Sequence, residues 1–190
     1  MWYDRDAKPR EECKRIYNQR IKLKRVVAER GNDLEEITGG NLSPGIQYRF
    51  VTNKAFNAIT VLKWIADKYE ILECSVAVYR MNQASVRFLR ELIEGVPCKI
   101  VVSNFFRENK KYEAWAKELV AFGETSETAR VAFALNHAKV FTCKTKCGKL
   151  VVFEGSGNLS DNSRVEQYLI EDNAQTYAMH ELWISEILDK

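Results

Sequence analysis

Residues 71–102 read ILECSVAVYRMNQASVRFLRELIEGVPCKIVV, in which two apolar runs flank an amphipathic segment. The runs Ile71–Tyr79 and Cys98–Val102 are almost continuously apolar, which is typical of strands buried on both faces of a sheet. Between them, apolar residues recur at helical spacing over 84–94, and a Gly-Val-Pro sequence at 95–97 ends that segment. This order predicts an α/β protein whose sheet is covered by helices on both faces.

The alternation of strands and helices continues on both sides of this unit. The other elements expected are strands at Tyr48–Val51 and Val165–Ile170, β-rich runs at Arg130–Thr142 and Lys149–Glu154, and helices at Ala58–Tyr69, Lys110–Phe122 and Ala174–Leu188. The connector at 143–148 is too short for a crossover helix, so the two β-rich runs are expected to form a hairpin. The predicted fold is therefore a mixed β-sheet flanked by helices.

Residues 1–45 differ from the rest of the chain. Basic residues crowd a narrow apolar stripe there, which predicts a basic N-terminal helix that Gly31-Asn32 would stop, followed by a turn-rich linker. The main domain is expected to cover residues 46–190.

The charge balance limits how the chain could bind a polyanion. A net charge of +3 over 190 residues is small, so such binding must come from a local patch. Arg15, Lys22 and Arg25 of the basic helix are candidates for contacts with nucleic acid. The same helix could instead dock a dimer, or its charges could form an ordinary solvated face.

Membrane and redox features are sparse. No secretory signal and no apolar run of membrane-spanning length is visible, so we expect a cytoplasmic protein without stable membrane insertion. Cys74 and Cys98 lie in apolar strands and are expected to be reduced core thiols. Cys143 and Cys147 have the spacing of half a zinc site, but no second Cys/His pair accompanies them, so free thiols are expected.

Two short motifs carry the chemistry. His137 and Lys139 are separated by one residue, so in a strand they would point to the same face. On the returning arm of the hairpin, Ser156 and Asn158 alternate with Gly155 and Gly157, which would let the backbone approach a ligand closely. An imidazole, an ammonium and an amide suit attack on a tetrahedral anion by a nucleophilic imidazole, without a carboxylate cluster for a metal.

Polar residues also follow the strands before the hairpin. Arg80, Asn104 and Arg107 come after strand ends, where open α/β sheets bind ligands, and are candidate substrate contacts. Phe105 and Phe106 lie between the last two, where they could stack on bases or simply pack.

The two motifs together resemble the signature of the phospholipase D superfamily, which is His-x-Lys, then an Asp, then Gly-Ser-x-Asn. The resemblance covers most of the chain and implies that His137 forms a phosphohistidine or, in a partner copy, protonates the leaving oxygen. It implies that Lys139 and Asn158 bind phosphate oxygens with help from Ser156, and that Glu166 orients the histidine. The Asp of the motif is replaced by Lys144, and Asn158 lies closer to Glu166 than in the family pattern.

Sites of this family need two copies of the motif, and this chain has one. Its other histidine, His180, is expected to be a structural or surface residue of a helix. The resemblance therefore implies a homodimer, and we expect a metal-independent nuclease for DNA or RNA that needs no cofactor. The alternatives are a phospholipase D or phosphatidyltransferase, and a catalytically inactive module of the same fold that binds nucleic acid.

Overall fold

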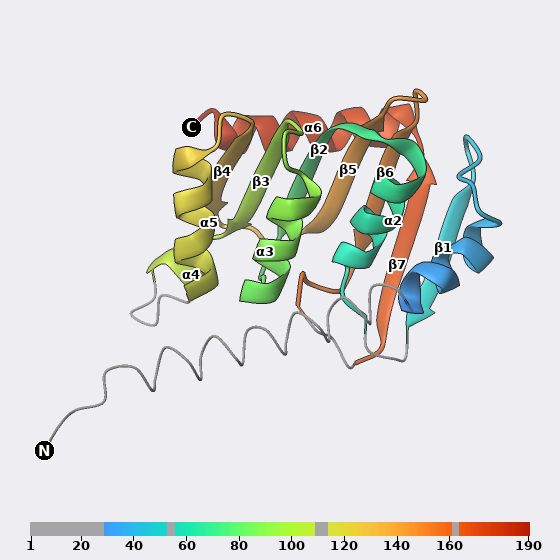
Figure 1. Ribbon diagram of the computed structural model, residues 1–190, viewed down its shortest axis with the longest axis horizontal. Helices are drawn as coiled ribbons and strands as arrows, with labels where there is room; N and C mark the ends of the chain where they lie inside the picture. The colour runs from blue at the N-terminus through green and yellow to red at the C-terminus, as the bar shows by residue number, and fades with distance from the viewer. Residues whose placement is uncertain (1–28, 53–55, 109–113, 161–163) are drawn as a thin grey trace, which may run out of the picture.

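The computed structural model describes residues 29–52, 56–108, 114–160 and 164–190. Its centre is a seven-stranded mixed sheet with the strand order β1-β7-β6-β5-β2-β3-β4 (Figure 1). The strands are β1 (Gln47–Thr52), β2 (Ile71–Val78), β3 (Cys98–Ser103), β4 (Ala129–Ala134), β5 (Lys139–Thr145), β6 (Leu150–Gly155) and β7 (Glu166–Asp172). The α/β class and the mixed sheet expected from the sequence are confirmed.

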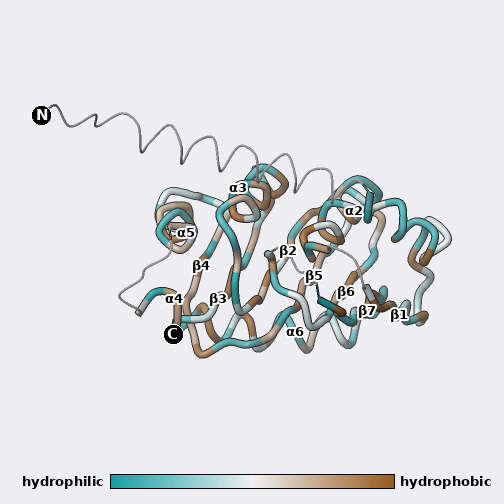
Figure 2. The backbone as a smooth tube through the Cα atoms, turned by 90° about the horizontal axis from the view of Figure 1, so that it is seen from below, coloured by the Kyte–Doolittle hydropathy of each residue, from teal (hydrophilic) through white to brown (hydrophobic). Residues whose placement is uncertain are grey.

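Helices cover both faces of the sheet. Figure 2 shows α2, α3 and α5 on one face and α6 on the other. The helix bounds are α2 (Ile59–Tyr69), α3 (Gln83–Leu92), α4 (Phe105–Glu108), α5 (Ala114–Thr125) and α6 (Ala174–Leu188). The bounds of α6 agree with the sequence prediction, whereas the short α4 carried no helical periodicity and was not expected.

The prediction of one continuous β-rich run at Arg130–Thr142 is wrong. This segment forms two strands, of which β4 pairs in parallel with β3 at the sheet edge and β5 pairs antiparallel with β2. Residues 135–138 join them and cross the ends of β3 and β2. The expected β5–β6 hairpin is present, with Phe141 opposite Phe153.

The N-terminal part of the described chain also departs from expectation. Residues 29–38 are helical, so Gly31-Asn32 does not stop the helix. The helix ends at Thr38, and Gly39 follows it with a φ of +61°, the left-handed conformation common for a glycine just after a helix. Leu34 and Leu42 are fully buried in the same core as the sheet, and this packing outweighs the weak helix propensity of Gly31. Arg15, Lys22 and Arg25 lie outside the described residues, and the boundary at residue 45 stays a prediction.

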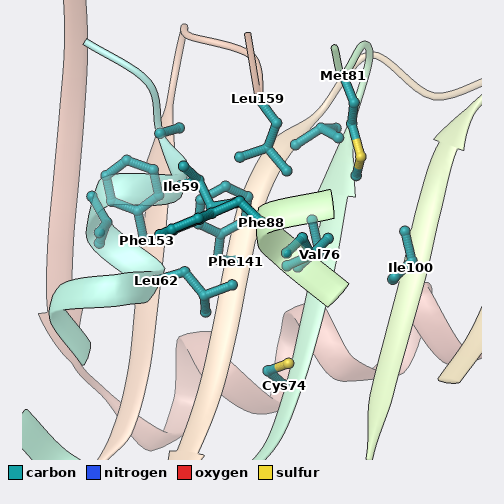
Figure 3. Close-up of a cluster of buried hydrophobic side chains, with 14 of the residues drawn as sticks. Ile59, Leu62, Cys74, Val76, Met81, Phe88, Ile100, Phe141, Phe153 and Leu159 are labelled. Atoms are coloured by element: carbon teal, nitrogen blue, oxygen red, sulfur yellow. The ribbon is translucent and has the colours of Figure 1, made fainter. Parts of the chain in front are cut away.

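The main core lies between the sheet and the helices α2, α3 and α5. Figure 3 shows Phe141 and Phe153 near its middle, with Met81 and Leu159 at one end. Cys74, Cys98 and Cys143 are buried free thiols, as expected for the first two. Cys147 is free and exposed. Within the described residues, no helix is both long and apolar enough to cross a membrane.

Candidate active site

The topology gathers both motifs at one edge of the sheet. The strands β2, β3 and β4 are parallel, β5 and β7 run the opposite way, and β6 again runs parallel to β2. The carboxyl ends of β2, β3 and β6 and the amino ends of β5 and β7 therefore share an edge. The two motifs, the loops after β2 and β3, and Glu166 all lie there.

His137 and Lys139 are in direct contact. Both residues were expected in one strand. Lys139 is the first residue of β5, but His137 lies in the loop just before it, so the expectation is wrong for His137. The Lys139 Nζ atom lies 3.0 Å from His137 Nδ1 and donates to the His137 carbonyl oxygen at 2.7 Å. The Tyr79 ring packs against the imidazole with centroids 4.6 Å apart.

Burial changes the protonation equilibrium of Lys139. Its desolvation disfavours the charged form and lowers the pKa of the ammonium, while the nearby Glu166 carboxylate partly opposes that shift. A cation that has lost much of its hydration is ready to exchange its present partners for the oxygen of a bound anion.

Asn136 fixes the crossing loop, and sequence reasoning missed it. Its side chain is buried, and its Nδ2 donates to the carbonyl oxygens of Val78 at 3.1 Å and Val101 at 3.2 Å. Its Oδ1 accepts from the Ala138 N–H at 2.9 Å. Asn136 thus ties the residues on both sides of His137 to the ends of β2 and β3. Nothing in the sequence marks these partners, because they are 58 and 35 residues away.

Asn136→Ala is expected to lower the free energy of unfolding by about 2–4 kcal/mol, since it removes the partner of the carbonyl groups of the buried residues Val78 and Val101 and of the N–H of the half-buried Ala138. Chemical denaturation of both proteins measures this difference. The control is Leu135→Ala at the neighbouring residue, which is 95% exposed. The control should stay within about 0.5 kcal/mol of the parent protein. Equal stability of Asn136→Ala and Leu135→Ala would contradict the anchoring role.

The second motif begins at the end of β6. Ser156 Oγ accepts from the Gln167 N–H at 3.0 Å and donates to the Glu166 carboxylate. Gly155 lies under the Tyr168 ring, where an added Cβ atom would approach Tyr168 Cδ1 to 2.1 Å. Glycine is therefore required at 155 for the ring to close the core beneath the motif.

Asn158 links this motif to the loop after β2. Its Oδ1 accepts from the Arg80 N–H at 3.1 Å, and the Asn82 N–H donates to the Leu159 carbonyl oxygen at 3.0 Å. Met81 and Leu159 form a β-bridge and are both buried. The Gly-Ser-x-Asn loop is thereby held against the strand end that carries Tyr79.

The other residues predicted to bind substrate contact different parts of the structure. The Arg80 guanidinium stacks on Phe106, whereas that of Arg107 stacks on Phe133 of the edge strand β4. Asn104 donates its N–H to the Ala134 carbonyl oxygen at 2.8 Å. Gly157 is buried between Ser156 and Asn158.

Two carboxylates have partners that the motif did not predict. Glu166 accepts a hydrogen bond from Ser156, and the contact at His137 Nδ1 comes from Lys139, so the orienting role expected of Glu166 stays a prediction. Glu73 lies 3.8 Å from the ammonium of Lys144, the residue that replaces the aspartate of the motif.

His180 is buried on α6, which covers the face of the sheet opposite α2, α3 and α5. Its Nε2 lies 2.5 Å from Glu154, and its Nδ1 accepts from Trp183 Nε1 at 3.0 Å, so it is a structural residue of α6 as expected. Among residues 29–52, 56–108, 114–160 and 164–190, no three His, Cys, Asp or Glu side chains are grouped to hold a metal ion.

No protein-family model matches the sequence, and neither does any curated protein. Among solved structures, NucT from Helicobacter pylori matches with a TM-score of 0.53 at 15% identity, over 76% of this chain and 97% of that one. The phospholipase D family member Nuc from Salmonella typhimurium matches with a TM-score of 0.50 at 14% identity, over 74% and 95%. Polyphosphate kinase from Porphyromonas gingivalis matches with a TM-score of 0.54 at 14% identity, over 76% of this chain and 26% of that one. At these identities the likeness shows the fold.

Proposed function

We propose that this chain, whose fold is that of the phospholipase D superfamily, is a homodimeric, metal-independent nuclease acting on DNA or RNA. The observation that carries the proposal is that His137 and Lys139 and the Ser156–Asn158 loop lie at the same edge of the sheet, where the start of β5 pairs with the end of β6. The side chains gathered there are an imidazole, an ammonium, a hydroxyl and an amide, which can attack and hold a phosphodiester.

The proposed first step is attack of His137 Nε2 on phosphorus. Attack from Nε2 requires the proton of the neutral imidazole to reside on Nδ1, so the contact between Lys139 Nζ and Nδ1 must open. An incoming phosphate oxygen would draw the ammonium away, and the Asn158 amide would bind a second oxygen. The phosphorus–nitrogen bond forms as the bond to the leaving oxygen breaks, and that oxygen takes a proton.

The donor of that proton is proposed to be His137 of the partner subunit. The same imidazole would then accept a proton from the water that hydrolyses the phosphohistidine, which restores both histidines and releases a phosphate monoester. Each chain carries a single His-x-Lys motif, so a two-fold dimer is the simplest arrangement that supplies two copies. Arg15, Lys22 and Arg25 remain proposed contacts to the nucleic acid backbone.

An assay in EDTA tests the proposal. The purified protein is incubated with single- and double-stranded DNA, with RNA and with phosphatidylcholine vesicles. Cleavage of nucleic acid at a rate that the chelator leaves nearly unchanged is expected, because none of the motif residues is a carboxylate that would cage Mg²⁺. Cleavage of lipid alone would overturn the nuclease proposal.

The replacement of the motif aspartate by Lys144 favours one alternative, a module that binds nucleic acid without cleaving it. Binding without cleavage in any of these conditions would support that alternative.

A further inference from the structure

The ring of Tyr79 packs against His137, the ring of Phe105 lies next to Tyr79, and the proposed chemistry uses neither ring. Tyr79 follows β2 and Phe105 opens α4 directly after β3, so the parallel pairing of these strands places the residues side by side. Their ring centroids are 6.4 Å apart with an interplanar angle of 26°. We name the rings of Tyr79 and Phe105 the aromatic shelf.

Buried neighbours hold the shelf in place. Phe106 contacts both shelf rings edge-on, with centroids 5.2 Å apart in each case, and its ring centroid also lies 5.2 Å from that of Trp115. Phe106 and Trp115 are buried, whereas Phe105 is 51% exposed. The core therefore anchors one aromatic ring of the 105–106 pair and leaves the other open to a ligand.

The shelf adjoins the groups proposed to act on phosphate. The Tyr79 ring contacts the His137 imidazole at 4.6 Å and lies under the Lys139 ammonium at 5.7 Å. A phosphodiester held by His137 and Lys139 would place its next substituent near Tyr79 and Phe105. The ligand of the shelf is therefore a group attached to that phosphate.

We propose that the aromatic shelf binds an unpaired nucleobase adjacent to the scissile phosphate, an inference that rests on the proposed nuclease function. Every nucleobase has a flat π-face that stacks on an aromatic ring, largely independently of base identity. Within a duplex both faces of a base are covered by neighbouring bases, so a base must be unpaired or flipped out to use the shelf.

The surroundings of the shelf favour a nucleic acid over a lipid. The guanidinium of Arg80 lies 5.6 Å from the Phe106 ring centroid, and that of Arg107 lies 5.7 Å from the Phe133 centroid. Arg80 thus lies against a ring that contacts both shelf rings, Arg107 is two residues from Phe105 in the chain, and both cations suit the phosphates of a polyanion. Acyl chains would need a broad apolar surface, whereas here the polar Asn104 directly precedes Phe105.

Binding of oligonucleotides measured by fluorescence anisotropy tests the shelf. The probes are a single-stranded deoxyoligonucleotide, its duplex, and an abasic chain with the same number of phosphates. Binding is measured in a His137→Ala background, so that cleavage does not interfere, and cleavage is assayed separately in the unmodified protein. The single strand should bind roughly 5- to 100-fold more tightly than the abasic chain.

Phe105→Ala should reduce that ratio to near one, and Phe105→Trp should retain it. The matched control is Leu182→Ala on α6, across the sheet, where the leucine is 64% exposed and the ratio should not change. Light scattering of each variant shows whether it keeps the oligomeric state of its parent.

The outcomes separate the shelf from the proposed function. Base-dependent binding that Phe105→Ala removes supports the shelf, even if the unmodified protein cleaves nothing and the nuclease proposal fails. Equal binding of the base-containing and abasic chains overturns the shelf, even if cleavage is observed. Binding of phosphatidylcholine vesicles that depends on Phe105, or dissociation of an oligomer by Phe105→Ala, also overturns it, because the ring would then serve a lipid or a subunit interface.

Discussion

Replacing His137 with alanine is expected to lower the turnover of phosphodiester substrates by about 10³-fold or more. The proposed reaction forms a covalent bond at the imidazole, and no other side chain at this sheet edge combines a nucleophilic nitrogen with contacts to Lys139 and Tyr79 among the described residues. Steady-state kinetics of both proteins in EDTA measure the effect. Acid quenching of the unmodified enzyme should trap a phosphate bonded to His137.

The loss should be one of chemistry rather than of folding. His137 is exposed, so alanine at this position removes little buried surface and should leave the free energy of unfolding within about 0.5 kcal/mol. Leu135→Ala, in the same crossing loop, is the kinetic control and should retain turnover. Full activity of His137→Ala would remove the imidazole mechanism altogether.

A mixed dimer of one unmodified and one His137→Ala subunit is expected to be nearly inactive. Attack needs a neutral imidazole and protonation of the leaving group needs a charged one, so one histidine cannot fill both roles in one step. If the two roles belong to two copies of His137, alanine in either subunit removes one of them. Subunits carrying two different affinity tags allow the mixed dimer to be isolated and assayed.

Stoichiometry distinguishes this arrangement from independent sites. Independent sites would leave the mixed dimer with half of the unmodified activity, and that result would show that each site is complete in one chain. Sedimentation at working concentrations should find a dimer, and a monomer that turns over at full rate would lead to the same conclusion.

Much of the fold followed from local pattern. The apolar runs at Ile71–Val78 and Cys98–Ser103 form buried parallel strands, and the periodic segment that became α6 was predicted from Ala174 to Leu188. The β5–β6 hairpin was also predictable, because a short connector between two β-rich runs leaves few alternatives. These features depend on neighbours in sequence, so a window of the chain contains the information that sets them.

The candidate site likewise has features that the sequence predicted and features that depend on tertiary contacts. Residue types and spacing were enough to single out His137, Lys139, Ser156 and Asn158 as candidates, because both motifs are defined by residues close together in the sequence. The split of 130–142 into β4 and β5 was not visible, since both halves have strand-like composition and only pairing with β3 and β2 separates them. The helix through Gly31 likewise depends on burial of Leu34, which its own propensity does not reveal.

The sequence by itself determined most of the strands and helices, the β5–β6 hairpin and the chemical groups of the motifs, because propensity, periodicity and motif spacing act over short stretches of chain. Only the tertiary structure decided that Asn136 anchors the crossing loop to Val78 and Val101, that Tyr79 packs against the histidine, and that Phe105 lies next to Tyr79. These contacts join segments far apart in the chain at the shared edge of the sheet. They arise from the order in which strands pair, and that order is set by packing of the whole core rather than by any local pattern.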